Sequence, residues 1–241
     1  MNGEGAAFYA RRGTRLADLW TLLHPPYTAW NMSYVAIGAA LAPTVDWQVL
    51  AIMLLAFFSG TGIAAHALDE YNGRPLQTGF SDRELQLLAA GGLILPAILT
   101  VILIQYTSPM ILSLLGAGTF LVLAYNLEWW RGLFHSDLGF ALSWGAFPVI
   151  AGYWTQSGTI SGSALAGAAA AALFSLAQRS LSTQARFVRR KTRNCCALFN
   201  TEEKVKRWEK DELLNTWEKP LRLLAWAVTL LAIGLLVGKM E

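Results

Sequence analysis

The chain has 241 residues, of which 54% are hydrophobic and 15% are charged, and its mean hydropathy is +0.39. This composition excludes an ordinary soluble globular protein, in which about 25% of the residues are charged. The formal net charge is +3, and no basic and aromatic recognition motif accompanies it, so we expect no nucleic-acid partner.

The N-terminal stretch MNGEGAAFYARRGTRLADLW is charged and includes Arg11, Arg12 and Arg15. It lacks the short apolar core and small-residue cleavage site of a secretory signal peptide, so we expect it to be retained. We interpret residues 1–26 as a cytoplasmic N-terminal segment.

Seven apolar windows follow. A helix needs about 20 apolar residues to cross the hydrocarbon core, which is about 30 Å thick. The windows are too long and too uniformly apolar for the alternating strands of a barrel. The predicted fold class is therefore an all-α, polytopic transmembrane helical bundle of about seven spans, at residues 27–43, 47–68, 85–105, 109–125, 138–154, 160–181 and 221–237.

The basic residues predict the orientation, because Lys and Arg collect in cytoplasmic loops. With the N-terminus inside, the inner loops carry Arg74, Arg83, Arg131 and a segment from 179 to 222 that holds 12 of the 19 basic residues. In this topology, Lys239 is the only basic residue on the outer side of the membrane. We therefore expect a multi-pass membrane protein with cytoplasmic basic loops, a surface that attracts anionic headgroups or phosphorylated substrates.

A charged stretch, AAHALDEYNGRPLQTGFSDREL, separates the second and third windows. On a helix His66, Asp69 and Glu70 share one face, which can present two or three ligands to one cation. Mg²⁺ prefers the carboxylates to the imidazole. The alternative is an interfacial charge cluster, including Arg74, that only ends two helices.

The end of this stretch predicts a helix start. Ser81 is the expected N-cap and Glu84 its capping-box partner, with Phe80 and Leu85 as a hydrophobic staple.

The order of features resembles the UbiA-type intramembrane prenyltransferase superfamily. The resemblance runs, with gaps, from residue 19 to residue 158. It rests on the segments LWTLLHPPYTAWNMSYVAIGAALAP, GTGIAAHALDEYNGRPLQTGFSDREL and YNLEWWRGLFHSDLGFALSWGAFPVIAGYWTQSG. The family is an all-helical bundle, usually of nine spans. Its members transfer a prenyl group from a prenyl diphosphate to an acceptor, and two Asp-rich motifs hold Mg²⁺ and the diphosphate.

The first Asp-rich motif is only partly present. Asp69 matches one of its acids, Glu70 and His66 are substitute ligands, and Gly73 stands where the last acid would fall. Arg74 resembles the arginine that follows the motif in many members. By resemblance, Asp69 and Glu70 are catalytic, Mg²⁺ is the cofactor held by Asp69, Glu70 and His66, and Arg74, Tyr125 and Arg131 bind the substrate. Arg186 and Arg190 are added as substrate-binding residues from the arginine-rich stretch of this chain, not from the family pattern.

The second Asp-rich motif is absent, because residues 175–200 contain no carboxylate. Arginines stand there instead. On a helix Arg186, Arg189 and Arg193 share a face with Ser182, and this face can grip a diphosphate directly or equally serve as positive-inside anchoring.

The segments around this region complete the predicted domain organisation. Residues 27–190 form the UbiA-like core. Residues 191–219 form a basic cytoplasmic loop with an amphipathic helix, indicated by apolar residues such as Trp208 and Trp217 among charges. Residues 220–241 form the last span. Cys195 and Cys196 are adjacent and expected to be reduced, because a disulfide between neighbours is strained.

The resemblance implies an integral-membrane prenyltransferase that moves a prenyl group from a polyprenyl diphosphate to an unknown acceptor. The alternative is a non-catalytic relative that binds an isoprenoid or another lipid, or docks a partner. An unrelated transporter is disfavoured because the span interiors are nearly free of charge. His24, His135 and Asp137 are interpreted as interfacial residues.

Overall fold

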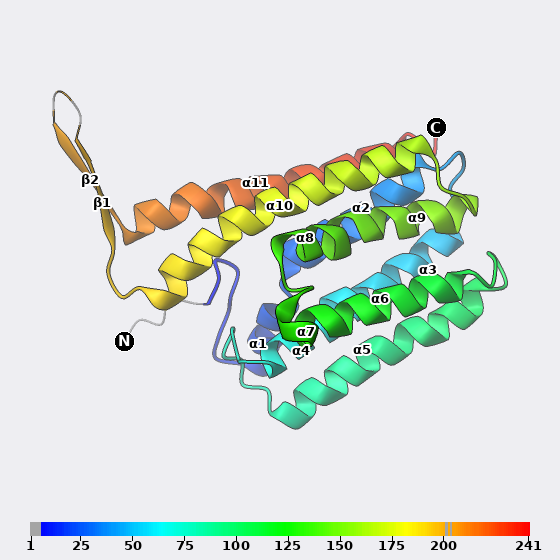
Figure 1. Ribbon diagram of the computed structural model, residues 1–241, viewed down its shortest axis with the longest axis horizontal. Helices are drawn as coiled ribbons and strands as arrows, with labels where there is room; N and C mark the ends of the chain where they lie inside the picture. The colour runs from blue at the N-terminus through cyan, green and yellow to red at the C-terminus, as the bar shows by residue number, and fades with distance from the viewer. Residues whose placement is uncertain (1–5, 201, 203) are drawn as a thin grey trace.

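The computed structural model describes residues 6–200, 202 and 204–241 (Figure 1). Helices dominate, two of them π-helical segments, and one two-stranded hairpin interrupts them. In chain order the elements are α1 (Arg15–Leu22), α2 (Pro25–Leu41), α3 (Trp47–Phe57), η1 (Phe58–Ala65), α4 (His66–Tyr71), α5 (Asp82–Leu103), α6 (Ile111–Asn126), α7 (Trp129–Gly132), α8 (Asp137–Phe140), η2 (Ala141–Ala146), α9 (Phe147–Ser157), α10 (Gly162–Lys191), β1 (Cys196–Asn200), β2 (Val205–Glu209) and α11 (Lys210–Val237).

Within the described residues, four helical stretches are long and apolar enough to cross a membrane: Trp47–Tyr71, Asp82–Leu103, Gly162–Lys191 and Lys210–Val237. The other three predicted windows are also helical, in α2, in α6 and in the run from α8 to α9. The helical bundle is thus confirmed, whereas the count of seven spans stays a prediction.

The outer face of α11 suits a lipid environment. Leu223, Trp226, Leu230 and Ile233 each leave more than half of their surface uncovered. A continuous apolar face of this kind is rare on a soluble monomer and typical of contact with hydrocarbon or another protein.

The centre of the bundle depends on close contact between α2 and α9. A Cβ atom on Gly38 would lie 2.1 Å from the carbonyl oxygen of Val149, and one on Gly152 would lie 2.2 Å from that of Val35. Only glycine permits this distance, and small residues at helix contacts are typical of membrane bundles. The pair lies between α10 and α11 on one side and α3 and α6 on the other (Figure 1).

The start of α5 agrees with the sequence. Ser81 Oγ accepts from Glu84 N at 3.3 Å, and Ser81 N donates to Glu84 Oε2 at 2.7 Å, which completes the capping box. Phe80 and Leu85 pack in one apolar cluster with Leu22.

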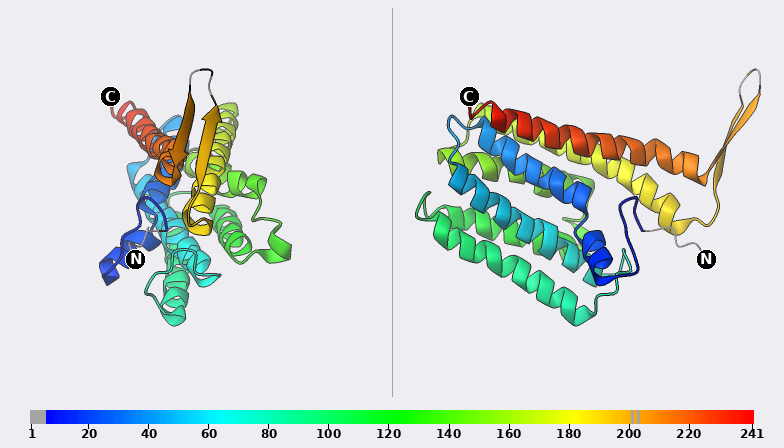
Figure 2. Two further views of the ribbon diagram at one scale, coloured as in Figure 1. Left: turned by 90° about the vertical axis from the view of Figure 1, so that its left-hand side faces the viewer. Right: turned by 180° about the vertical axis from the view of Figure 1, so that it is seen from behind.

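Residues 191–219, which were predicted to hold an amphipathic helix, have a different structure from the predicted one. This segment begins with the β1–β2 hairpin, in which Cys196 lies opposite Glu209, and only from Lys210 is it helical. Aromatic and β-branched residues such as Phe199 and Val205 favour strands, which explains the difference. The hairpin extends beyond the ends of α10 and α11, and α11 continues without a break across the predicted boundary at 219 (Figure 2).

Candidate functional site

A cavity of about 330 Å³ opens between the N-terminal segment, α2, the run from η1 to α4, α6, the start of α8–α9, and α10 with α11. This volume lies in the range of small-molecule sites. The cavity brings together five of the eight predicted site residues: His66, Asp69, Tyr125, Arg186 and Arg190.

One side chain ties the cavity wall together. Asn31 of α2 donates from Nδ2 to the carbonyl of Trp144 in η2 at 3.0 Å and accepts at Oδ1 from Thr61 Oγ1 in η1 at 3.0 Å. All three residues line the cavity. π-helical turns are frequent at functional sites, and here both of them border the same space.

The last turns of α10 make the cavity basic. Arg179, Arg186, Arg189 and Arg190 line it, against two carboxylates, Asp69 and Glu218. Arginines therefore outnumber acids in the lining, which favours an anionic ligand.

Two of these arginines are fully engaged by the protein. Arg189 donates from Nε and Nη2 to Glu218 Oε1 at 2.9 and 2.6 Å. Arg179 donates to Asp137 Oδ1 and to the hydroxyl of Tyr125, each at 2.5 Å. These contacts fix α10 against α11 and α6.

Among the described residues, the other two arginines donate hydrogen bonds only to uncharged oxygens. Arg190 donates from Nε to the carbonyl of Ala6 at 3.0 Å, and Arg186 donates to Thr183 Oγ1 at 3.1 Å. Within the described residues neither forms an ion pair with a carboxylate. Their charges are available to an anion in the cavity.

Aromatic rings form much of the remaining wall, among them Tyr27, Trp30, Tyr34, Phe140 and Trp144. The Tyr125 ring packs edge to face on Trp144 with centroids 5.5 Å apart and stacks on His135 at 4.5 Å. Such faces suit an isoprenoid chain and attract a cation.

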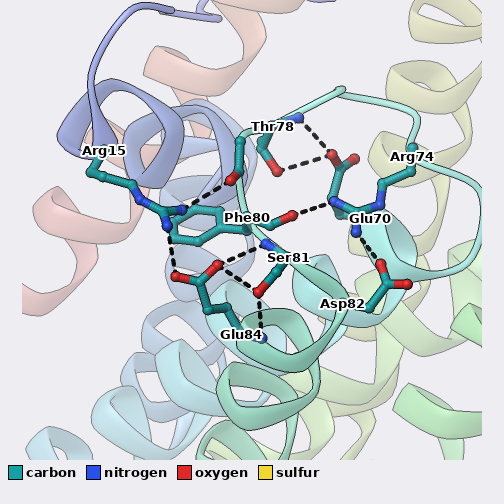
Figure 3. Close-up of polar contacts among 9 residues, drawn as sticks. Arg15, Glu70, Arg74, Thr78, Phe80, Ser81, Asp82 and Glu84 are labelled. Atoms are coloured by element: carbon teal, nitrogen blue, oxygen red, sulfur yellow. Dashed lines mark hydrogen bonds and ion pairs between the residues drawn. The ribbon is translucent and has the colours of Figure 1, made fainter.

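Glu70 and Arg74 serve the loop before α5 (Figure 3). Glu70 is 0% exposed and accepts from Leu76 N, Thr78 N and Thr78 Oγ1 at 2.8, 2.7 and 3.0 Å. Arg74 donates to the Phe80 carbonyl and pairs with Asp82. Neither residue lines the cavity.

Arg131 also lies apart from the cavity. It is exposed on the short helix α7 and has a positive φ of 60°. The structure therefore leaves three of the predicted site residues, Glu70, Arg74 and Arg131, outside the cavity lining.

The side chains predicted to hold Mg²⁺ do not converge. The described part of the chain contains no group of three His, Cys, Asp or Glu side chains placed to hold a metal, since the Glu70 carboxylate is used by the loop. The donors present do not fit a metal held by three protein ligands. A Mg²⁺ ion shared between Asp69 and substrate phosphates stays a prediction.

The contact between His24 and His66 was not predicted from the sequence. His24 stacks on His66 with ring centroids 4.2 Å apart and planes inclined by 15°. The Nδ1 atom of His24 lies 2.8 Å from the Tyr9 hydroxyl, and the backbone of His24 has a strained φ of 47°. Burial, and after it His66, lowers the pKa of His24, and burial raises the pKa of Tyr9.

The fold and the cavity define a helical bundle with four helices able to cross a membrane and an arginine-rich, aromatic-walled ligand cavity. Comparison with protein-family models, with curated proteins and with solved structures finds no match. The UbiA resemblance therefore rests on the sequence pattern alone.

Proposed function

We propose that the protein binds a prenyl diphosphate in this cavity and transfers the prenyl group to an acceptor, with the basic end facing the cytoplasm. The observation that carries the proposal is the pair Arg186 and Arg190. Both line the cavity without a carboxylate partner among the described residues, opposite an aromatic wall.

The arginines suit the diphosphate. A guanidinium group donates paired, charge-assisted hydrogen bonds to phosphate oxygens. Arg179 and Arg189, fixed by Asp137 and Glu218, hold the end of α10 in place, so that binding orders little besides Arg186 and Arg190.

The chemistry is an ionisation. The bond between C1 and the diphosphate oxygen breaks, the electron pair leaves with the diphosphate, and an allylic cation remains. Positioned guanidinium groups stabilise the charge that develops on the leaving group. Rings such as Trp144 and Phe140 can stabilise the cation by about 0.5–2 kcal/mol each.

The isoprenoid tail has a candidate location. A second, mostly apolar cavity of about 80 Å³ is lined by residues that include Met53, Phe57 and Leu115. It shares Thr61 and Trp144 with the main cavity. We propose that a chain anchored by its diphosphate at Arg186 passes these two residues to reach the apolar space.

The test is binding and turnover of farnesyl diphosphate by purified protein in nanodiscs. Replacing both cavity arginines, Arg186→Ala with Arg190→Ala, is expected to weaken donor binding at least tenfold and to stop diphosphate release. Arg131→Ala is the matched control, since this exposed arginine is outside the cavity. Equal losses in the double variant and the control would contradict the proposal.

A non-catalytic lipid-binding role is the second candidate. It is favoured by the Glu70 carboxylate, which is enclosed by the loop and so cannot join Asp69 at a metal. This role predicts donor binding that is equally tight in EDTA and in Mg²⁺, with no diphosphate release in either.

A further inference from the structure

Of the three histidines that line the cavity, two, His24 and His66, stack on each other and have no part in holding the diphosphate. His66 Nδ1 lies 3.0 Å from the carbonyl oxygen of Gly62. A carbonyl only accepts hydrogen bonds, so Nδ1 carries the hydrogen, and in the neutral ring Nε2 keeps a free lone pair. His66 lines the cavity, and its Nε2 has no hydrogen-bond partner among the described residues.

A second imidazole packs against His66. His24 stacks on His66 at 4.2 Å, and its own Nε2 is buried without a partner in the described part of the chain. Two imidazolium rings at this distance repel each other, and Arg186 and Arg190 of α10 add to the positive field. Two acids share the lining: Asp69, one turn along the helix from His66, and Glu218 of α11.

We propose that His66 Nε2 accepts the proton of a hydroxyl-bearing acceptor during prenyl transfer; this rests on the proposed function. The C1–O bond of the donor breaks and the diphosphate keeps the electron pair. The acceptor oxygen gives a lone pair to C1 to form an ether. The electrons of its O–H bond stay on oxygen, and the proton moves to Nε2.

The inference names an acceptor class. An alcohol or phenol must lose a proton when its oxygen forms the new bond, and the lone pair of His66 Nε2 in the cavity lining can accept it. An anionic nucleophile has no proton to lose. The two kinds of acceptor should therefore depend differently on His66.

The experiment compares benzyl alcohol with azide as acceptor probes, with farnesyl diphosphate as donor and protein in nanodiscs. His66→Gln is expected to lower formation of farnesyl benzyl ether about 100-fold, the lower range for loss of a general base. Formation of farnesyl azide is expected to stay within about twofold of the unchanged protein, because azide needs no base. Nitrogen-15 NMR of the labelled unchanged protein is expected to show the proton of His66 on Nδ1.

The outcomes separate the two proposals. An unchanged protein that binds donor but releases no diphosphate with either acceptor overturns the transferase proposal and this inference with it. Turnover in which His66→Gln forms the ether at the normal rate overturns the inference alone. It is overturned too if the variant loses ether and azide products equally, or if Asp69→Asn, and not His66→Gln, selectively loses the ether.

Discussion

The loop before α5 and the end of α10 are both rich in charge, but they use it differently. In the loop, the Glu70 carboxylate is enclosed by backbone and hydroxyl donors, and Arg74 pairs with Asp82. At the end of α10, Arg186 and Arg190 face a cavity, without a carboxylate partner among the described residues. Charge satisfied within a segment builds that segment, whereas unsatisfied charge beside a cavity is available to a ligand.

The largest effect is expected from the one buried carboxylate that connects α10 to α11. Glu218 is 4% exposed and accepts two hydrogen bonds from Arg189. Glu218→Ala leaves that guanidinium unpaired, and breaking a buried pair in this way costs about 3–5 kcal/mol. Denaturant unfolding in mild detergent measures the loss.

The same variant tests the role of paired arginines. At a temperature where Glu218→Ala is still folded, Arg189 becomes a further free cation in the cavity lining. If this variant binds farnesyl diphosphate more tightly than the unchanged protein does, the result supports the view that unpaired charge beside the cavity is available to a ligand. Weaker binding by folded protein would argue that Glu218 serves the ligand as well as the fold.

A smaller loss of stability is expected for Glu70→Ala. It removes the acceptor for the buried N–H groups of Leu76 and Thr78, and each unsatisfied buried donor costs about 1–3 kcal/mol. Asp82→Asn, at the exposed first residue of α5 beside this loop, is the matched control. If Glu70→Ala unfolds like the unchanged protein but cannot bind donor, the carboxylate belongs to the ligand site. That result would contradict the view that Glu70 only stabilises the loop.

The lowered pKa of His24 predicts a dependence of stability on pH. Below the ordinary histidine pKa of about 6.5, the unfolded chain binds a proton that the folded chain excludes, so stability falls as the pH falls. Above that pKa both states are neutral and this contribution is flat. One such group changes the unfolding free energy by at most about 1.4 kcal/mol per pH unit. His24→Gln is expected to flatten the slope between pH 6.5 and 5.5, and an unchanged slope would contradict this account.

The sequence was most informative where a pattern is local. Apolar windows predicted where helices lie, and the spacing of Ser81 and Glu84 predicted the capping box, because both depend on neighbours along one helix. The partners of Glu70 and of Arg179 could not be predicted, since they depend on how a loop folds back or on contacts 42 and 54 residues away. The hairpin was missed because its short strands lie among charges that also suit a helix surface.

Arg74 gives the smallest expected effect and the clearest contrast between resemblance and geometry. By resemblance it binds the diphosphate, but in the structure it supports the loop and does not line the cavity. Its partner Asp82 has a side chain that is 69% exposed, and exposed pairs contribute about 0–1 kcal/mol. Arg74→Ala is therefore expected to cost little stability and to leave the dissociation constant of farnesyl diphosphate within about twofold, as measured by titration in nanodiscs. A tenfold loss of affinity in folded Arg74→Ala protein would mean that the loop rearranges to bring this arginine to the ligand. In that case Arg74 would bind the ligand even though it pairs with Asp82 in the unliganded protein.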